Sequence, residues 1–138
     1  MIRNLGSSRF AILGVLLPLL LALGTLGCAV HGPQLRWQKI TVSSEAGKQP
    51  LLSGPPQTMG MRSGRVVLRP GEVMPRHSTE GNEELLVLLA GRAHVQFDEG
   101  FVETGVGEVL YIPPQTWHEV RNPGEDELRY IYVVAPAR

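Results

Sequence analysis

The sequence has a single cysteine, Cys28, and no cluster of basic residues. A lone cysteine excludes an intrachain disulfide, so packing must stabilise the fold. Basic and acidic residues number 13 each, without a lysine- or arginine-rich stripe, and this argues against a nucleic-acid partner. A nucleophilic triad, a phosphate loop and a dinucleotide fingerprint are also missing. These absences favour a small one-domain protein whose chemistry, if any, comes from another kind of site.

Long apolar runs are confined to the N-terminus. The first nine residues carry two arginines and no acid, residues 10–23 are almost wholly apolar, and small residues follow. This order is typical of a secretory signal peptide. The run is short for a membrane-spanning helix and contains Gly14 and Pro18, so a permanent transmembrane anchor is the weaker interpretation. We therefore expect residues 1–27 to be a signal peptide.

Cys28 lies directly after this segment and is preceded by Gly27. The position resembles the cleavage site of a bacterial lipoprotein, with Thr25 where leucine is usual. Lipidation would anchor the chain to a membrane without spanning it; ordinary cleavage nearby, for example after Ala29, is the alternative. In both cases the protein is expected to be exported to the periplasm or cell envelope. Without Arg3 and Arg9 the chain keeps 11 basic and 13 acidic residues, a formal charge of −2.

The remainder of the chain shows short apolar or alternating runs separated by glycine and proline turns, and no convincing helix. This pattern predicts an all-β sandwich or barrel. The expected strands are 35–42, 65–69, 74–77, 84–89, 92–98, 107–112, 116–121 and 128–134. Residues 43–58 are rich in Ser, Gly, Gln and Pro and are expected to form a loop, or a lid over the barrel. The expected organisation is a signal peptide (1–27), a tether with a first strand and loop (28–58), and a barrel (59–138).

Two spaced motifs carry the side chains that are able to bind a metal or take part in a reaction. Residues 71–91 contain His77 and Glu84, and residues 107–122 contain His118. Two imidazoles and one carboxylate on strands that could pair suit a divalent transition metal.

This spacing resembles that of the cupins. Their first motif runs Gly, five residues, His, one, His, three or four, Glu, six, Gly; their second runs Gly, five, Pro, one, Gly, two, His, three, Asn. Two positions depart from the pattern: Thr79 stands where the second histidine is expected, and Gln115 where a glycine is expected. The resemblance covers about residues 65–136 and is to a small single-domain, type 2-like cupin. The positions in register are Gly71, His77, Glu84, Gly91, Gly107, Pro113, His118 and Asn122.

The resemblance implies a double-stranded β-helix of the jelly-roll kind, the cupin barrel. It also implies a metal site with His77, Glu84 and His118 as ligands and water or substrate in the place of the missing histidine. The metal would be iron, manganese, nickel or zinc. Candidate pocket residues are Thr79, Gln115, Tyr111 and Trp117, with Gln115 expected in a type I-like turn that brings its amide to the pocket.

The leading functional hypothesis is an exported small cupin that binds a divalent metal, with dioxygenase-, isomerase- or lyase-type activity on a small organic substrate. The alternative is a non-catalytic envelope module in which the same three side chains form a hydrogen-bonded cluster and bind a sugar or small acid without metal. Whether the protein is an enzyme stays open between these two. Dimerisation is common among cupins, so a homodimer is a further expectation.

Overall fold

A computed structural model describes residues 35–138, which contain strands and turns but no helix. No segment of this part of the chain is therefore a helix able to cross a membrane. The strands are β1 (Gly47–Ser53), β2 (Arg62–Leu68), β3 (Val73–His77), β4 (Asn82–Ala90), β5 (Arg92–Phe97), β6 (Gly100–Gly105), β7 (Val109–Ile112), β8 (His118–Arg121) and β9 (Leu128–Pro136).

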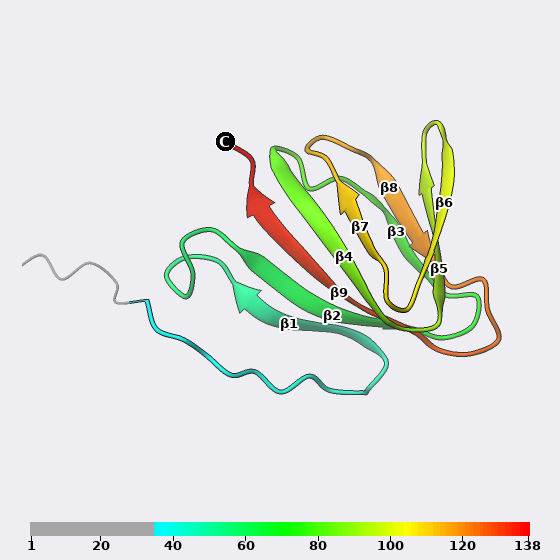
Figure 1. The fold of residues 1–138 in the computed structure, drawn as a ribbon, viewed down its shortest axis with the longest axis horizontal. Coiled ribbons are helices and arrows are strands. Elements are labelled where there is room, and N and C mark those ends of the chain that lie inside the picture. Colours follow the sequence, from blue (N-terminus) through cyan, green and yellow to red (C-terminus); the bar gives the residue numbers. More distant parts are fainter. Residues whose placement is uncertain (1–34) are drawn as a thin grey trace, which may run out of the picture. The chain divides into compact units, whose positions relative to one another are not determined.

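The strands form two antiparallel sheets. The larger has the order β1-β2-β9-β4-β7 and the smaller the order β3-β8-β5-β6. Figure 1 shows the larger sheet running diagonally and the smaller one facing it, with β4 turning into β5 where the chain passes from one sheet to the other. Neighbours in each sheet are mostly distant in sequence, which is the pattern of a jelly roll. The predicted all-β jelly-roll class is confirmed.

The core lies between the inner faces of the two sheets. Side chains of a strand alternate between its faces, and Glu84, Leu86 and Leu88 of β4 are all buried, at 5%, 1% and 3% exposure. As predicted, the carboxylate thus shares its face with two core leucines. The core cluster is Val66, Leu68, Leu86, Leu88, Ala93, Val95, Ile112, Val120, Leu128 and Tyr130.

The first strand differs from the prediction. Residues 35–42 form no strand, and β1 lies instead inside the predicted loop 43–58. It pairs with β2 along the edge of the larger sheet, and the register shifts between Pro50 and Leu52. A proline is tolerated at an edge strand or bulge because no ladder hydrogen bond is lost there. An edge strand with polar, half-exposed residues lacks the apolar pattern that identifies a strand in sequence.

The strand β6 was not predicted either. It forms a hairpin with β5, with Phe97 opposite Gly100 and Arg92 opposite Gly105. Glu99 and Gly100 were predicted to form a turn, and Phe101 and Val102 are 60% and 42% exposed. The strand is therefore held by pairing to β5 rather than by a buried face of its own.

Candidate metal centre

Three strands bring His77, Glu84 and His118 together. His77 ends β3 and His118 begins β8, and the two residues are directly paired across the sheet. Their ring centroids lie 4.5 Å apart. Glu84 comes from β4 of the other sheet, and its Oε2 lies 3.5 Å from His118 Nε2. One ligand atom from each residue lies within 4.8 Å of the other two, so the structure gathers the three predicted ligands at one point.

Hydrogen bonds to main-chain carbonyls orient both imidazoles. His77 Nδ1 lies 2.8 Å from the Pro75 oxygen, and His118 Nδ1 lies 3.1 Å from the Thr116 oxygen. A carbonyl oxygen only accepts, so Nδ1 of each ring carries a proton, and in the neutral ring Nε2 keeps its lone pair. Metal-bound histidines are typically held in this way, with the second ring nitrogen donating to a carbonyl or carboxylate.

Two buried atoms of the cluster have no hydrogen-bond partner among the described residues, Glu84 Oε2 and His118 Nε2. An unsatisfied buried polar atom costs about 1–3 kcal/mol. A cation or a shared proton between the two atoms would remove that cost. Two imidazole nitrogens and one carboxylate oxygen are suitable donors for a divalent transition metal, so the residues present fit one.

Burial shifts the protonation of Glu84 and His118 toward their neutral forms. It raises the pKa of Glu84, against the opposing effect of positive charge on His77 and Lys48. It lowers the pKa of His118, although the bond to the Thr116 carbonyl acts in the opposite direction. A neutral imidazole is the form that binds metal, and a bound cation would favour the ionised carboxylate.

The cluster lies in a cavity of about 380 Å³. Thr79, a predicted pocket residue, lines this cavity. Its hydroxyl donates to the Asn82 carbonyl at 2.8 Å, and the Asn82 side-chain amide donates to the Thr79 carbonyl at the same distance. Thr79 therefore closes the turn between β3 and β4. The remaining lining residues include Met74, Leu86, Val120, Tyr130 and Tyr132, with Lys48, Arg62 and Glu80 as further charged groups.

Three other predicted pocket residues lie outside this cavity. Tyr111, Gln115 and Trp117 line a separate surface groove together with Phe97 and Phe101. Tyr111 points out of β7, and its hydroxyl donates to Glu83 Oε2 at 3.2 Å. The rings of Tyr111 and Trp117 are about half exposed. Sequence alternation had placed these aromatics on strands but could not decide which surface they would face.

The turn at Gln115 also differs from the prediction. Gln115 has a φ of 60°, and Glu80 has a φ of 56°. The turn is thus left-handed, the conformation for which glycine is best suited, and not type I-like. The Gln115 amide nitrogen of the main chain donates to the Glu80 carbonyl, so the two left-handed residues stabilise one another beside the cavity.

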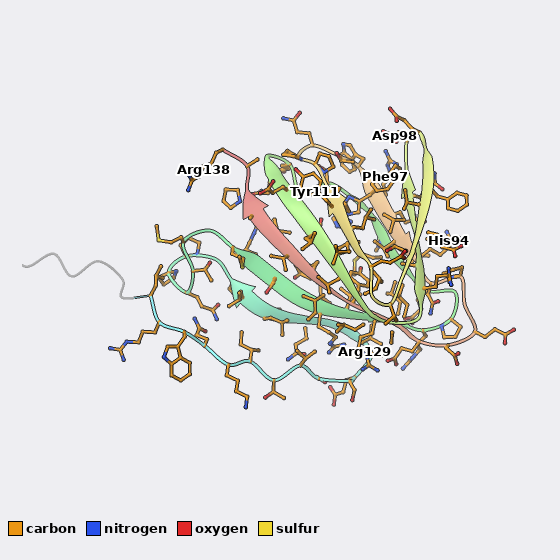
Figure 2. The ribbon with its side chains drawn as sticks, in the orientation of Figure 1. His94, Phe97, Asp98, Tyr111, Arg129 and Arg138 are labelled. Carbon is orange, nitrogen blue, oxygen red and sulfur yellow. The ribbon has the colours of Figure 1, made fainter. Side chains whose placement is uncertain are left out.

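Several cavity residues were missed from the sequence. Lys48 lies in the segment expected to be a loop, and Arg62 has no distinguishing motif. Tyr130 and Tyr132 belong to a predicted strand, and the period of two places them on one face with Leu128, which is fully buried. That alternation was the available signal for the tyrosines. His94, in contrast, lies on β5 (Figure 2) and is not part of the cluster. Its Nε2 lies 3.1 Å from Glu103 Oε2.

Fold and site together define a jelly-roll barrel with a cluster of two histidines and one glutamate in its cavity. Residues 64–134 match the family model described as Cupin domain. The chain therefore belongs to the cupin family, and the resemblance expected from the two motifs is confirmed. The predicted signal segment and Cys28 lie outside the described residues.

Solved structures show the same fold. A cupin protein from Bacteroides fragilis aligns with a TM-score of 0.61 at 21% identity, covering 73% of this chain and 85% of that chain. A Cupin 2 conserved barrel domain protein from Salinispora arenicola CNS-205 aligns with a TM-score of 0.59 at 23% identity, covering 72% and 82%. At these identities the likeness concerns the fold alone.

Two curated proteins are similar in sequence. One is named polyketide synthase CurC, from Streptomyces cyaneus, and is 31% identical over 84 residues, 59% of this chain and 54% of that protein. The other is named protein SchB, from Streptomyces halstedii, and is 33% identical over 84 residues, 59% of this chain and 61% of that protein. The chain thus spans less than two thirds of the length of either relative.

Proposed function

We propose that the protein is a small metallo-cupin that holds one divalent transition metal with His77, Glu84 and His118 and presents it to a small organic molecule in the cavity. The observation that carries the proposal is the pair of buried, unpartnered atoms, Glu84 Oε2 and His118 Nε2, that face each other. The oriented tautomers of both histidines support it. Iron, manganese, nickel and zinc all suit this donor set.

The chain's own residues would bind and orient a substrate. A bound metal would supply Lewis-acid or redox chemistry, in keeping with an oxidation, isomerisation or lyase reaction. Core side chains such as Leu86 and Val120 line the cavity and would exclude water from the reacting atoms. Glu84 would hold the metal as an ionised ligand, and its raised pKa favours the protonated form when no metal is bound. The name of one curated relative supports a molecule of the polyketide type as the substrate class.

A metal-free binding module is the second candidate, and the Thr79 geometry favours it. The hydroxyl of Thr79 closes a local turn, so a fourth protein ligand is not presented by this position. The three remaining side chains could then share a proton and bind a sugar or small acid by hydrogen bonds.

Metal analysis of the full-length chain, purified without chelator, separates the two candidates. We expect about one equivalent of metal per chain, and loss of at least nine tenths of it in His118→Ala, because that variant removes a buried ligand. His94→Ala is the matched control, since His94 pairs with Glu103 on the surface. No metal in the wild type, even after reconstitution with each of the four metals, would leave the binding module as the function.

We also propose that the chain is exported and anchored through a lipid on Cys28, on the strength of the N-terminal sequence pattern. Cys28→Ser, expressed in a bacterial host, should move the protein from the membrane fraction to the soluble fraction, because the acyl chain supplies the membrane affinity. Fractionation with immunodetection measures this. An unchanged membrane fraction would contradict the anchor.

A further inference from the structure

Two cations of the larger sheet line the cavity. Lys48 comes from β1 and Arg62 from β2, and both belong to the lining of the cavity that holds the histidine–glutamate cluster. Neither forms an ion pair among residues 35–138. Both side chains are exposed, which places them at the solvent-open part of the cavity while Glu84 and His118 lie buried within it.

The charges around the cavity do not balance once a metal is bound. Among its charged lining residues, Lys48 and Arg62 offset Glu80 and Glu84. Neutral histidines add nothing, so one divalent cation would leave an excess of two positive charges. Positive charge in a partly desolvated site attracts and selects anions. A ligand that carries negative charge at the cavity mouth would compensate this excess.

Tyr132 gives the charged side of the cavity a flat wall. The Lys48 ammonium lies 4.7 Å from the centroid of the Tyr132 ring. The ring lies against β2 at Gly64, where a Cβ would come within 2.5 Å of the Tyr132 hydroxyl oxygen. The absence of a side chain at Gly64 thus allows the ring to lie against the strand rather than in the cavity. The ring thus holds the Lys48 ammonium at the cavity wall, where a negatively charged group of a ligand would meet it.

We infer that the cavity selects small organic anions, with a carboxylate or acidic phenol group bound by Lys48 and Arg62 and an unsaturated body directed toward the cluster. The inference rests on the proposed function for the metal, which supplies the excess positive charge. Charged hydrogen bonds to ammonium and guanidinium groups are the strongest contacts these residues can offer such a ligand.

Calorimetric titration of the full-length, zinc-loaded chain tests the inference. The probes are benzoate, 4-nitrophenolate and the neutral isostere benzamide. We expect one or both anions to bind about ten-fold or more tightly than benzamide, because a charged contact is worth roughly one order of magnitude in affinity. Benzoate and 4-nitrophenolate distinguish a carboxylate site from a phenolate site.

Lys48→Met and Arg62→Met should each weaken anion binding about ten-fold with the zinc content unchanged. Lys39→Met is the control variant, because it removes a cation outside the cavity.

The outcomes separate this inference from the proposed function. Zinc retention with equal binding of benzamide and both anions, or anion binding that is indifferent to Lys48→Met and Arg62→Met, overturns the anion site and leaves the metal centre standing. Failure to hold zinc or any of the other three metals overturns the metal centre. The same titrations on the metal-free chain then decide the anion site. A preference for the anions over benzamide that is lost in both Lys48→Met and Arg62→Met supports the site. The absence of such a preference in the unsubstituted chain contradicts it.

Discussion

At the scale of single residues, the centre is dominated by buried groups with unused hydrogen-bonding capacity. Glu84 is 5% exposed and His118 1% exposed. Within residues 35–138, Glu84 Oε2 and His118 Nε2 have no hydrogen-bond partner. Such groups destabilise a fold unless a ligand or proton satisfies them. The site therefore lowers the free energy of unfolding of the metal-free protein, and a metal or ligand that binds there raises it.

The substitution Glu84→Gln tests this cost. Burial raises the pKa of Glu84 above its usual 4.5, so the folded chain binds this proton more tightly than the unfolded chain. The free energy of unfolding contributed by Glu84 consequently falls as pH rises from about 4.5 through the raised pKa. We expect the metal-free Glu84→Gln variant to equal the wild type at low pH and to exceed it by about 1–2 kcal/mol at pH 7.

Urea unfolding of chelator-treated protein at several pH values measures this difference. Glu83→Gln is the control, because Glu83 lies next in the chain and accepts a hydrogen bond from Tyr111 at the surface. A Glu84→Gln variant that is less stable than the wild type at pH 7 would show that the carboxylate is already satisfied without metal.

At the scale of elements, the pairing of β2 with β9 shapes the cavity wall. Gly64 and Tyr132 are directly opposite in this ladder, and the tyrosine ring covers the glycine. A glycine inside a strand weakens the strand but permits close approach of a neighbouring group. The wall therefore depends on one residue without a side chain.

Gly64→Ala should push the Tyr132 ring toward the cavity, because the new Cβ would meet it at 2.5–2.6 Å. Overpacking of this kind costs about 1–3 kcal/mol. Thermal unfolding should show the loss, and the cavity should bind benzoate less well while the metal content stays unchanged. Gly81→Ala is the matched control, since its Cβ would meet nothing within 4 Å. Equal behaviour of the two variants would contradict the steric role of Gly64.

At the scale of the whole molecule, Asn122 joins the two sheets. It follows β8 and is 1% exposed. Its side-chain amide donates to the Leu68 carbonyl at 3.0 Å and the Asp126 carbonyl at 2.8 Å, and its Oδ1 accepts from the Gly124 amide at 3.0 Å. Leu68 ends β2 of the larger sheet, so one side chain connects the end of that sheet with the turn that leads into β9. The last position of the second motif is thus structural.

Asn122→Ala should lower the free energy of unfolding by about 2–4 kcal/mol, because it leaves buried carbonyl and amide groups without partners. Denaturant unfolding measures the loss, and metal analysis should show the wild-type content at temperatures where the variant stays folded. Gln96→Ala removes an exposed amide that also donates to two carbonyls and should cost less than about 1 kcal/mol. A similar cost for both variants would show that burial of Asn122 adds nothing.

The strands with strong apolar alternation were predictable, and the edge strands were not. Glu84 could be placed beside Leu86 and Leu88 because a period of two assigns faces without any knowledge of partners. β1 and β6 are edge strands whose residues are largely polar or exposed, and their conformation depends on the neighbouring strand that pairs with them. Gln115 misled the prediction for a related reason, because its left-handed φ is stabilised by a bond to Glu80 in a different loop.

The sequence by itself determined the all-β class through its periodicity, and it determined the family and the three clustered side chains through the resemblance of two spaced motifs to those of cupins. Only the tertiary structure decided which surfaces meet. Strand pairing sets His77 opposite His118, and the packing of the two sheets adds Glu84 to them. The same packing brings Lys48, Arg62 and Tyr132 to the cavity and leaves Tyr111 and Trp117 outside it. Local patterns specify the face of a strand but not the strand that will cover it, because that depends on burial summed over the whole fold.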